Sequence, residues 1–350
     1  MKIMLIALAV AAAVSAAAAD DAKPKQRSWR VSDVAGLIAA VRDVPAEGGI
    51  ITLEPGTYEI TEPLVFDRKS QVNLVGSGWS TVIQKKGDGD AIVFRGSCWN
   101  TRVHNMTIQG DKDAKKGSGI VYRDGEWSGI NVVDLVHVDY FAEHGISYEG
   151  TAKTPFSSNT ISNCWLTNNL GDQIHSVFNN DFYMYGNQMG KGGDRSPRSG
   201  ALLDNSSAGT YTMNYHWGNK VALRLVSAHF NRIENNRFEQ SSENGILIGD
   251  PKGGGICQLT IITGNTIHTN AEGNSGKFNA VEAYDAHAFT FTNNQIFSWA
   301  SDTVKAKSGL ALGKNCTKWI IKDNIIRHCA AKPLVYNPKD GHVVKDNIID

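Results

Sequence analysis

Apolar and polar positions follow a six-residue frame along most of the chain. In this frame an apolar residue is followed two positions later by Asn, Asp or Gly, and five positions later by a second apolar residue. The copies read VHNMTI at 103–108, ISNCWL at 161–166, MYGNQM at 184–189, IENNRF at 233–238, ITGNTI at 262–267, FTNNQI at 291–296, IKDNII at 321–326 and VKDNII at 344–349. When weaker copies that start near Val72, Val133 and Thr212 are included, successive copies begin roughly 20 to 30 residues apart, which is typical of stacked units that bury their apolar faces against their neighbours.

A second short apolar segment follows each frame, as in GISYE at 145–149, QIHSV at 173–177 and GILIG at 245–249. Two or three short strands per repeat, joined by turns rich in Gly, Asn and Asp, predict an all-β fold, a parallel β-helix of about ten coils. Adjacent coils lie about 4.8 Å apart in such a stack. The asparagines of the frame are expected to stack at a bend and to bond the backbone of neighbouring coils.

The N-terminal region carries two further signals. Lys2, an apolar stretch over 3–14 and small residues after it are typical of a signal peptide, which we place at 1–19. A disordered lead-in over 20–28 and a single β-helix domain over 29–350 follow, and a secreted or periplasmic bacterial protein without a membrane span is expected. Apolar residues at helical spacing over 32–44, behind Ser32 as N-cap, predict a helix that covers the first coil.

The segment 48–84, GGIITLEPGTYEITEPLVFDRKSQVNLVGSGWSTVIQ, resembles the first coils of the pectate-lyase-like right-handed β-helix superfamily. The matching positions are Pro55, Gly56, Tyr58, Gly76, Gly78, Thr81 and Ile83. The resemblance implies a right-handed solenoid over nearly the whole mature chain. It implies no single reaction, since the superfamily includes polysaccharide lyases, hydrolases, epimerases, transferases and viral tailspikes, so the reaction has to be argued from a site.

Charge and cysteine content narrow the choice of partner. Without Lys2, 34 basic residues face 35 acidic ones, a balance that gives no support to nucleic-acid binding. Five cysteines without CxxC spacing favour small buried residues, although Cys316 and Cys329 are able to pair in an oxidising compartment.

The second strand of each repeat is expected to present two outward rows of side chains. The inward residues are the apolar ones, and the first outward row reads Ser147, His175, Leu202, Arg224, Leu247, Glu282 and Ala311. The next outward row reads Glu149, Val177, Asp204, Val226, Gly249, Tyr284 and Gly313. Charged and aromatic groups therefore gather on the middle coils.

One candidate catalytic set combines His175, Asp204 and Arg224 from three adjacent coils. Elimination at a uronic-acid sugar needs a cation beside the substrate carboxylate and a base for the adjacent proton. Arg224 is the candidate cation, His175 the base, and Asp204 an orienting group or a metal ligand. A surface salt network among the three is the alternative without chemistry.

Several residues near this set are candidate substrate contacts. Tyr215 and His216 can supply an acid, and Trp217 a surface for stacking a sugar ring. The insertion GKGGDRSPRSG at 190–200 is a candidate loop over the cleft whose Arg195 and Arg198 contact an acidic sugar.

A second candidate set is acidic and comprises Asp250, Asp285 and Glu282, with Tyr284 as a nearby substrate contact. Paired carboxylates suit a glycoside hydrolase or a glycosyl transferase. The same three side chains offer oxygen ligands for calcium, the only cofactor that the sequence suggests, or the two aspartates simply form Asx-turns.

These observations favour a secreted polysaccharide-degrading enzyme, a lyase that cleaves an acidic glycan by β-elimination. A glycoside hydrolase or glycosyl transferase that uses the acidic set is the alternative enzyme, and a non-catalytic sugar-binding rod is the alternative without chemistry. The expected partner is a polysaccharide, and the rod is compatible with a monomer or a homotrimer.

Overall fold

The computed structural model describes residues 27–193, 195–299 and 303–350. The predicted signal peptide and most of the lead-in lie outside these residues. The described chain starts at Arg27, and the first strand, β1 (Ser28–Val31), begins one residue later.

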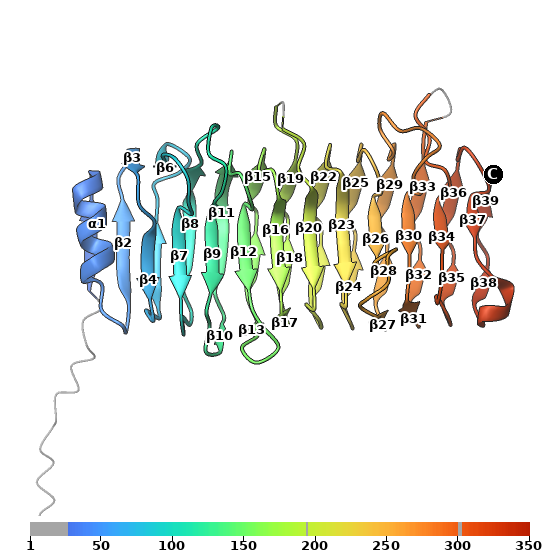
Figure 1. Ribbon diagram of the computed structural model, residues 1–350, viewed down its shortest axis with the longest axis horizontal. Coiled ribbons are helices and arrows are strands. Elements are labelled where there is room, and N and C mark those ends of the chain that lie inside the picture. Colours follow the sequence, from blue (N-terminus) through green and yellow to red (C-terminus); the bar gives the residue numbers. More distant parts are fainter. Residues whose placement is uncertain (1–26, 194, 300–302) are drawn as a thin grey trace, which may run out of the picture.

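The described strands wind into a rod of stacked coils, from the blue N-terminal end to the red C-terminal end in Figure 1. One side of the rod is a parallel sheet of eleven strands, one from each turn, and we call it the eleven-stranded sheet. Its strands are β4 (Leu64–Asp67), β7 (Ile92–Arg95), β9 (Ile120–Arg123), β12 (Ile146–Glu149), β16 (Asp172–Val177), β20 (Ser199–Asp204), β23 (Val221–Val226), β26 (Ile246–Ile248), β30 (Val281–Ala283), β34 (Leu310–Leu312) and β37 (Leu334–Val335). The predicted parallel β-helix is confirmed.

The rest of the rod is a second parallel sheet whose strands form two columns, the ladder column and the third column. The ladder column contains β2 (Gly49–Leu53), β5 (Val72–Val75), β14 (Thr160–Ser162), β18 (Tyr183–Tyr185), β21 (Thr210–Thr212), β24 (Arg232–Glu234), β28 (Ile261–Thr263), β32 (Thr290–Thr292), β35 (Ile320–Lys322) and β38 (Val343–Lys345). The third column contains β3 (Gly56–Ile60), β6 (Thr81–Lys85), β15 (Trp165–Thr167), β19 (Gln188–Gly190), β22 (Tyr215–Trp217), β25 (Arg237–Glu239), β29 (Thr266–His268), β33 (Gln295–Phe297), β36 (Ile325–Arg327) and β39 (Ile348–Ile349). Two long strands, β8 (Arg102–Gln109) and β11 (Val132–Asp139), run through both columns.

The six-residue frame forms the bend between these two columns. Its third residue takes a left-handed conformation, with φ of +55° at Asn235 and +56° at Asn293. Asn and Gly tolerate this conformation best, which explains the composition of the frame. The fourth residue turns inward and forms the predicted ladder, which runs through Asn187, Asn214, Asn236, Asn265, Asn294, Asn324 and Asn347.

The core is a set of columns of stacked side chains inside the coils. The predicted inward residues of the eleven-stranded sheet pair in register, with Ile146 beside Ile174, and Leu223 beside Ile246. A second column stacks the rings of Phe66, Phe94, Tyr122 and Tyr148 at centroid distances of 4.9, 4.7 and 4.6 Å. Burial of these columns is the main source of stability in such a stack.

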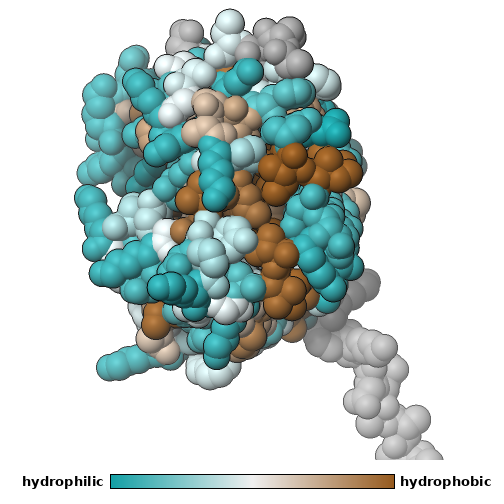
Figure 2. Space-filling view, turned by 90° about the vertical axis from the view of Figure 1, so that its right-hand side faces the viewer, coloured by the Kyte–Doolittle hydropathy of each residue, from teal (hydrophilic) through white to brown (hydrophobic). Residues whose placement is uncertain are grey.

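The helix α1 (Val34–Asp43) covers the N-terminal coil through buried Leu37, Ala40 and Val41. The predicted N-cap is wrong by one residue, because Asp33 rather than Ser32 accepts a hydrogen bond, from the Gly36 N–H at 2.7 Å. The opposite end shows apolar side chains among polar ones (Figure 2), and exposed residues of the last coil include Val343 and Ile348.

The remaining described elements are short. They are β10 (Ser128–Gly129), β13 (Phe156–Ser157), β17 (Asn179–Asn180), β27 (Cys257–Gln258), β31 (Ala286–His287) and the 3-10 helix η1 (Pro338–Asp340). All five cysteines are free, so Cys316 and Cys329 are not paired. No helix among the described residues is long and apolar enough to cross a membrane.

Candidate functional site

The outer face of the eleven-stranded sheet has the two predicted rows. Ser147, His175, Leu202, Arg224 and Leu247 occupy successive positions of the first row, followed by Glu282 and Ala311. Glu149, Val177, Asp204 and Val226 occupy the second. Sequence spacing therefore placed these side chains on the correct coils and the correct face.

The strongest cluster of charged groups on this face is centred on Asp172, at the start of β16. Its carboxylate is fully buried and accepts a hydrogen bond from His175 Nδ1 at 2.8 Å. Arg198, on the loop before β20, donates to both carboxylate oxygens, from Nε to Oδ1 at 3.0 Å and from its terminal nitrogen to Oδ2. The Asp172 backbone N–H donates to His144 Nδ1 at 3.0 Å, and the rings of His144 and His175 stack at 4.0 Å. We call these four side chains the Asp172 cluster.

The environment holds Asp172 in its charged form. Burial favours the protonated acid and on its own would raise the pKa of Asp172. Hydrogen bonds from His175 and Arg198 favour the carboxylate more strongly and hold the pKa well below its usual range. The negative charge is therefore present at any physiological pH, and it fixes the Nδ1–H tautomer of His175.

His144 is the neutral member of the cluster. Burial, followed by the neighbouring His175 and Arg198, lowers the pKa of His144 to about 4, although Asp172 partly opposes the shift. Its Nδ1 accepts the Asp172 N–H, so its proton is on Nε2. His175 differs, because Nδ1–H faces Asp172 and leaves Nε2 as a free acceptor. A buried carboxylate that orients an imidazole with 18% of its surface exposed in this way can serve general-base catalysis.

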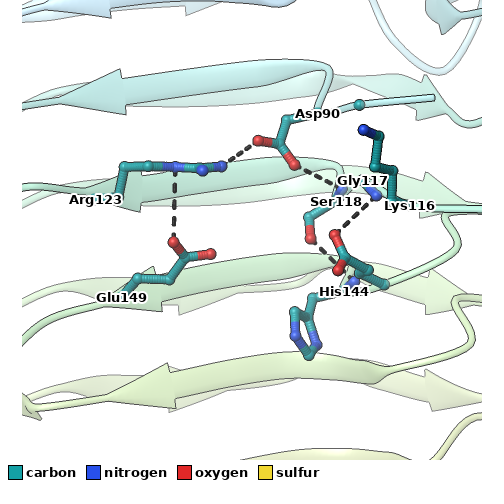
Figure 3. Close-up of a pocket in the computed structure, with 9 residues that line it drawn as sticks. Asp90, Lys116, Gly117, Ser118, Arg123, His144 and Glu149 are labelled. Atoms are coloured by element: carbon teal, nitrogen blue, oxygen red, sulfur yellow. Dashed lines mark hydrogen bonds and ion pairs between the residues drawn. The ribbon is translucent and has the colours of Figure 1, made fainter.

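A pocket of about 340 Å³ adjoins His144 on the N-terminal side of the cluster (Figure 3). Arg123 bridges two of its acidic walls, Asp90 and Glu149, with 3.6 Å between Arg123 Nε and Glu149 Oε2. Lys116 lines the opposite side, and Asp90 accepts the Ser118 N–H at 2.9 Å. The pocket and the cluster form one polar stretch along the strand ends of five successive coils.

The predicted orienting role of Asp204 needs correction. Among the described residues its carboxylate accepts a side-chain hydrogen bond only from its neighbour Asn205, at 2.8 Å, and it does not orient His175. Arg224 lies in the row of His175, two coils away and about 10 Å along the rod, as the sequence leads one to expect, and its role as the cation stays a prediction. The alternative of a surface salt network among His175, Asp204 and Arg224 is not found in the described part of the chain, and the orienting carboxylate is Asp172.

The two arginines of the 190–200 loop are bound to the protein itself. Arg198 forms an ion pair with Asp172, as described above, so its guanidinium is already bound to a carboxylate of the protein. Arg195 donates to the backbone oxygens of Tyr140 and Lys112, which anchors the loop to two earlier coils. The loop thus contributes Arg198 to the Asp172 cluster, and the expected contact of Arg195 and Arg198 with an acidic sugar stays a prediction.

The three residues predicted on β22 lie away from His175, on the third column. Tyr215 and Trp217 point outward, with ring centroids 5.1 Å apart. His216 points into the coil, is fully buried and lies 2.6 Å from the Tyr211 hydroxyl through Nε2. Because strand residues alternate between faces, His216 cannot contact a substrate while Tyr215 and Trp217 do.

Each carboxylate of the acidic set is bound to its own protein partner. Asp250 accepts the Lys252 N–H at 2.9 Å, the Asx-turn alternative, and Asp285 accepts from Asn315 at 2.6 Å. Glu282 accepts from Tyr284 at 2.6 Å and from Asn244 at 3.1 Å, four coils beyond His175. No hydrogen bond joins any two of the three carboxylates among the described residues, and Tyr284 supports Glu282 rather than an open cleft.

One group in the described part of the chain has spacing suited to a metal. His144, Asp172 and His175 each offer a ligand atom, and these atoms lie within 4.8 Å of one another. Imidazole nitrogens suit zinc and related metals, whereas calcium prefers oxygen ligands, so the group does not support the expected calcium. The bidentate bond from Arg198 also places a positive charge on the carboxylate that a metal would need.

Sequence reasoning missed Asp172 and His144. They lie at the corner after the third column, Asp172 as the first residue of β16 and His144 two residues before β12, at positions whose parity matches the inward Ile174 and Ile146. Strict alternation would place them in the core. The available signal was an ionisable residue of inward parity, repeated on two adjacent coils.

Comparison with known proteins agrees with this architecture. A family model described as a right-handed β-helix region matches residues 90–296 and 199–350. No curated protein sequence matches the chain.

Solved structures with the same fold have low sequence identity to the chain. The A-module of mannuronan C-5 epimerase AlgE4 from Azotobacter vinelandii is 17% identical with a TM-score of 0.61, over 90% of this chain and 100% of that one. DFA-IIIase from Arthrobacter chlorophenolicus A6 is 13% identical with a TM-score of 0.66, over 92% and 94%. The enzymatically active domain of bacteriophage CBA120 tailspike protein 2 is 13% identical with a TM-score of 0.65, over 90% of this chain and 48% of that one. At these identities the likeness establishes the fold.

Proposed function

The chain belongs to the right-handed β-helix family, and from this premise we propose that it is a carbohydrate-active enzyme that cleaves an acidic glycan by β-elimination. The observation that carries the proposal is the bond between buried Asp172 and His175 Nδ1 at 2.8 Å. It leaves His175 Nε2 as a base at the outer face of the eleven-stranded sheet.

The proposed reaction starts at the carbon beside the uronate carboxylate. His175 Nε2 takes the proton from this carbon, and the electron pair of the C–H bond forms a double bond to the neighbouring ring carbon. The glycosidic oxygen on that carbon leaves with the bonding electrons and takes a proton from solvent. The Asp172 carboxylate stabilises the imidazolium that forms, as a buried carboxylate beside a catalytic histidine does in general.

Arg224 is the proposed partner for the substrate carboxylate. Its side chain is partly exposed, lies in the same outward row as His175 and forms no ion pair with a described carboxylate. A cation beside the substrate carboxylate lowers the energy of the negative charge that develops when the adjacent proton leaves. Arg198 cannot take this role without releasing Asp172.

The named activities of the fold relatives support a sugar substrate. The AlgE4 module is named for C-5 epimerisation of mannuronan, a reaction that also acts at the carbon beside a uronate carboxylate. A polymeric glycan also fits the predicted export of the chain, which we retain as part of the proposal.

The test is digestion of polymannuronate, polyguluronate and polygalacturonate, followed by ultraviolet absorbance, because elimination alone creates a conjugated double bond. We expect absorbance to rise with the parent protein and not with His175→Ala. The appearance of reducing ends without this absorbance would instead support a hydrolase that uses Asp250, Asp285 or Glu282.

A further inference from the structure

The outer face of the third column carries a row of large aromatic side chains outside the proposed catalytic site. Trp79, on the loop after β5, lies 6.2 Å from Trp165, and Trp165 lies 5.8 Å from Trp217, between ring centroids. Trp217 in turn lies 5.1 Å from Tyr215. We call these four residues the aromatic row. They come from three coils, with Tyr215 and Trp217 both on β22, so the row runs along the rod axis from Trp79 to Trp217.

The chain holds these rings in place through their polar edges. The Trp217 Nε1–H donates to the Lys191 carbonyl at 2.8 Å, and the Trp79 Nε1–H donates to the Leu135 carbonyl at 3.4 Å. Gly190 leaves space for Trp217, because a Cβ at this position would lie 2.4 Å from the indole ring. Trp217 therefore reaches back over the coil of Gly190 towards Trp165.

Polar groups alternate with the rings along the same face. His137, Trp165, Gln188, Tyr215 and Arg237 occupy successive positions of one row in strand register. The Gln188 amide is half-buried and forms no side-chain hydrogen bond within the described residues. A free amide between two aromatic rings offers both stacking and hydrogen bonding, which is the combination that a sugar ring needs.

On this face two carboxylates are buried and two cationic side chains are exposed. Asp139 is buried and accepts hydrogen bonds from Thr167 and Asn168 at 3.0 and 2.9 Å. Glu239 is buried and accepts from Arg237 and His268, each at 2.8 Å. Lys191 and Arg237 remain exposed; Arg237 is paired with Glu239, whereas Lys191 has no carboxylate partner among the described residues.

We propose that the aromatic row, with Gln188 and the exposed cations, binds a stretch of acidic polysaccharide along the rod axis. The occupant is a glycan rather than a protein, because hydrogen-bonding groups interrupt the apolar surface at every second coil. This site lies on a different sheet from the Asp172 cluster, so it extends the proposed function without depending on the reaction.

The test measures binding with His175→Ala, which keeps the row intact and lets the polymer survive the experiment. Affinity electrophoresis in polymannuronate, polygalacturonate and neutral dextran gives the dissociation constants. Trp165→Ala and Trp217→Ala in this background should each weaken polyuronate binding by about tenfold. Trp127→Ala is the matched control, since Trp127 is 62% exposed and lies outside the row.

Two further variants keep the result interpretable if a tryptophan variant does not fold. Trp217→Phe keeps an aromatic ring in place of the indole, and Trp79→Ala removes a ring that is half exposed. Both should weaken binding as the other row variants do. Affinities equal to that of Trp127→Ala, or no binding of either polyuronate by the parent, would overturn the proposal. If dextran binds as tightly as the polyuronates, the claim that the bound polysaccharide is acidic is wrong.

These outcomes are separate from those of the catalytic proposal. If the parent cleaves no glycan but the row variants lose polyuronate binding, the aromatic row stands and the reaction does not. If elimination occurs and the row variants bind as the parent does, the reaction stands and the aromatic row does not.

Discussion

At the residue scale, one buried carboxylate organises the proposed chemistry. Asp172 fixes His175 through Nδ1, is held by Arg198 and offers its backbone N–H to His144. A buried charge is tolerated only when hydrogen bonds compensate it, and here each carboxylate oxygen has a charged or polar donor. His175 is thereby held in one tautomer with Nε2 free.

Replacing the carboxylate tests this role. Asp172→Asn keeps the shape but removes the charge that stabilises the imidazolium, so kcat should fall by about 10²-fold or more. Asp204→Asn is the matched control, because the Asp204 carboxylate accepts a side-chain hydrogen bond only from Asn205 among the described residues. This variant should keep nearly the parent rate. Equal losses in the two variants, measured by initial rates on a polyuronate, would contradict the assignment.

The titration of His144 predicts how stability depends on pH. Its pKa is about 4 in the folded protein and about 6.5 in an unfolded chain, so the unfolded chain binds more protons between these values. The free energy of unfolding should therefore fall as the pH drops from about 6.5 to about 4. In His144→Asn this decrease in the free energy of unfolding should be smaller by an amount on the order of 3 kcal/mol.

Urea unfolding at pH 7 and at pH 4 measures the two free energies for each protein. The same pH dependence in the parent and in His144→Asn would show that His144 is not the responsible group. Asp172, whose folded pKa is depressed, contributes stability that is lost only below about pH 4.

Residue positions were predictable from the sequence where strict alternation holds. It placed His175, Arg224 and Glu282 in one outward row, and the strand register confirms this. It failed at Asp172, because the backbone turns a corner there and a carboxylate of inward parity reaches an outward histidine. Hydrogen-bond partners across coils, such as Arg198, depend on loop conformation that the repeat does not encode.

At the element scale, the bend between the ladder and third columns gives each coil the same geometry. The Asn265 Oδ1 accepts from both the backbone and the side-chain nitrogens of Asn236, and its Nδ2 donates to Ile233 O at 2.9 Å. The frame predicted this ladder because a left-handed residue and a buried amide recur at fixed spacing. It did not distinguish their two roles, since Asn occurs at both positions.

Position within the ladder should set the cost of losing a rung. Asn265→Ala leaves buried donors and acceptors on both sides without partners and should cost about 2–3 kcal/mol. Asn347→Ala removes the last Asn of the ladder, which accepts from two nitrogens of Asn324 and donates to the Ile321 and Lys345 carbonyls, but it is partly exposed, so water can replace these bonds and the cost should be lower than for Asn265→Ala. Denaturant midpoints measure both costs, and equal values would contradict the ladder account.

At the scale of the whole molecule, the rod behaves as a row of coils that each contact only their neighbours. Helix α1 covers the first coil, whereas the last coil exposes Ile348 and Ile349 by 53% and 44%. The eleven-stranded sheet and the third column meet at one corner of each coil. The proposed catalytic site and the aromatic row therefore lie on neighbouring faces of the rod.

This arrangement predicts a gradient of local stability. Amides of β38 and β39 have coils on one side only and should exchange with solvent deuterium before those of β20 and β23. Hydrogen exchange followed by mass spectrometry measures the order. Exchange of all coils at one rate would indicate that the rod opens as a single unit.

The most direct test of the central claim follows the proton that His175 is proposed to remove. Proton NMR of a polyuronate incubated in deuterium oxide reports the hydrogen beside the carboxylate and any new vinyl hydrogen. With the parent protein we expect the signal of the hydrogen beside the carboxylate to decrease and a vinyl signal to appear. With His175→Ala the spectrum should not change. Chain cleavage in which that hydrogen is retained and no vinyl signal appears would contradict proton abstraction by the Asp172–His175 pair.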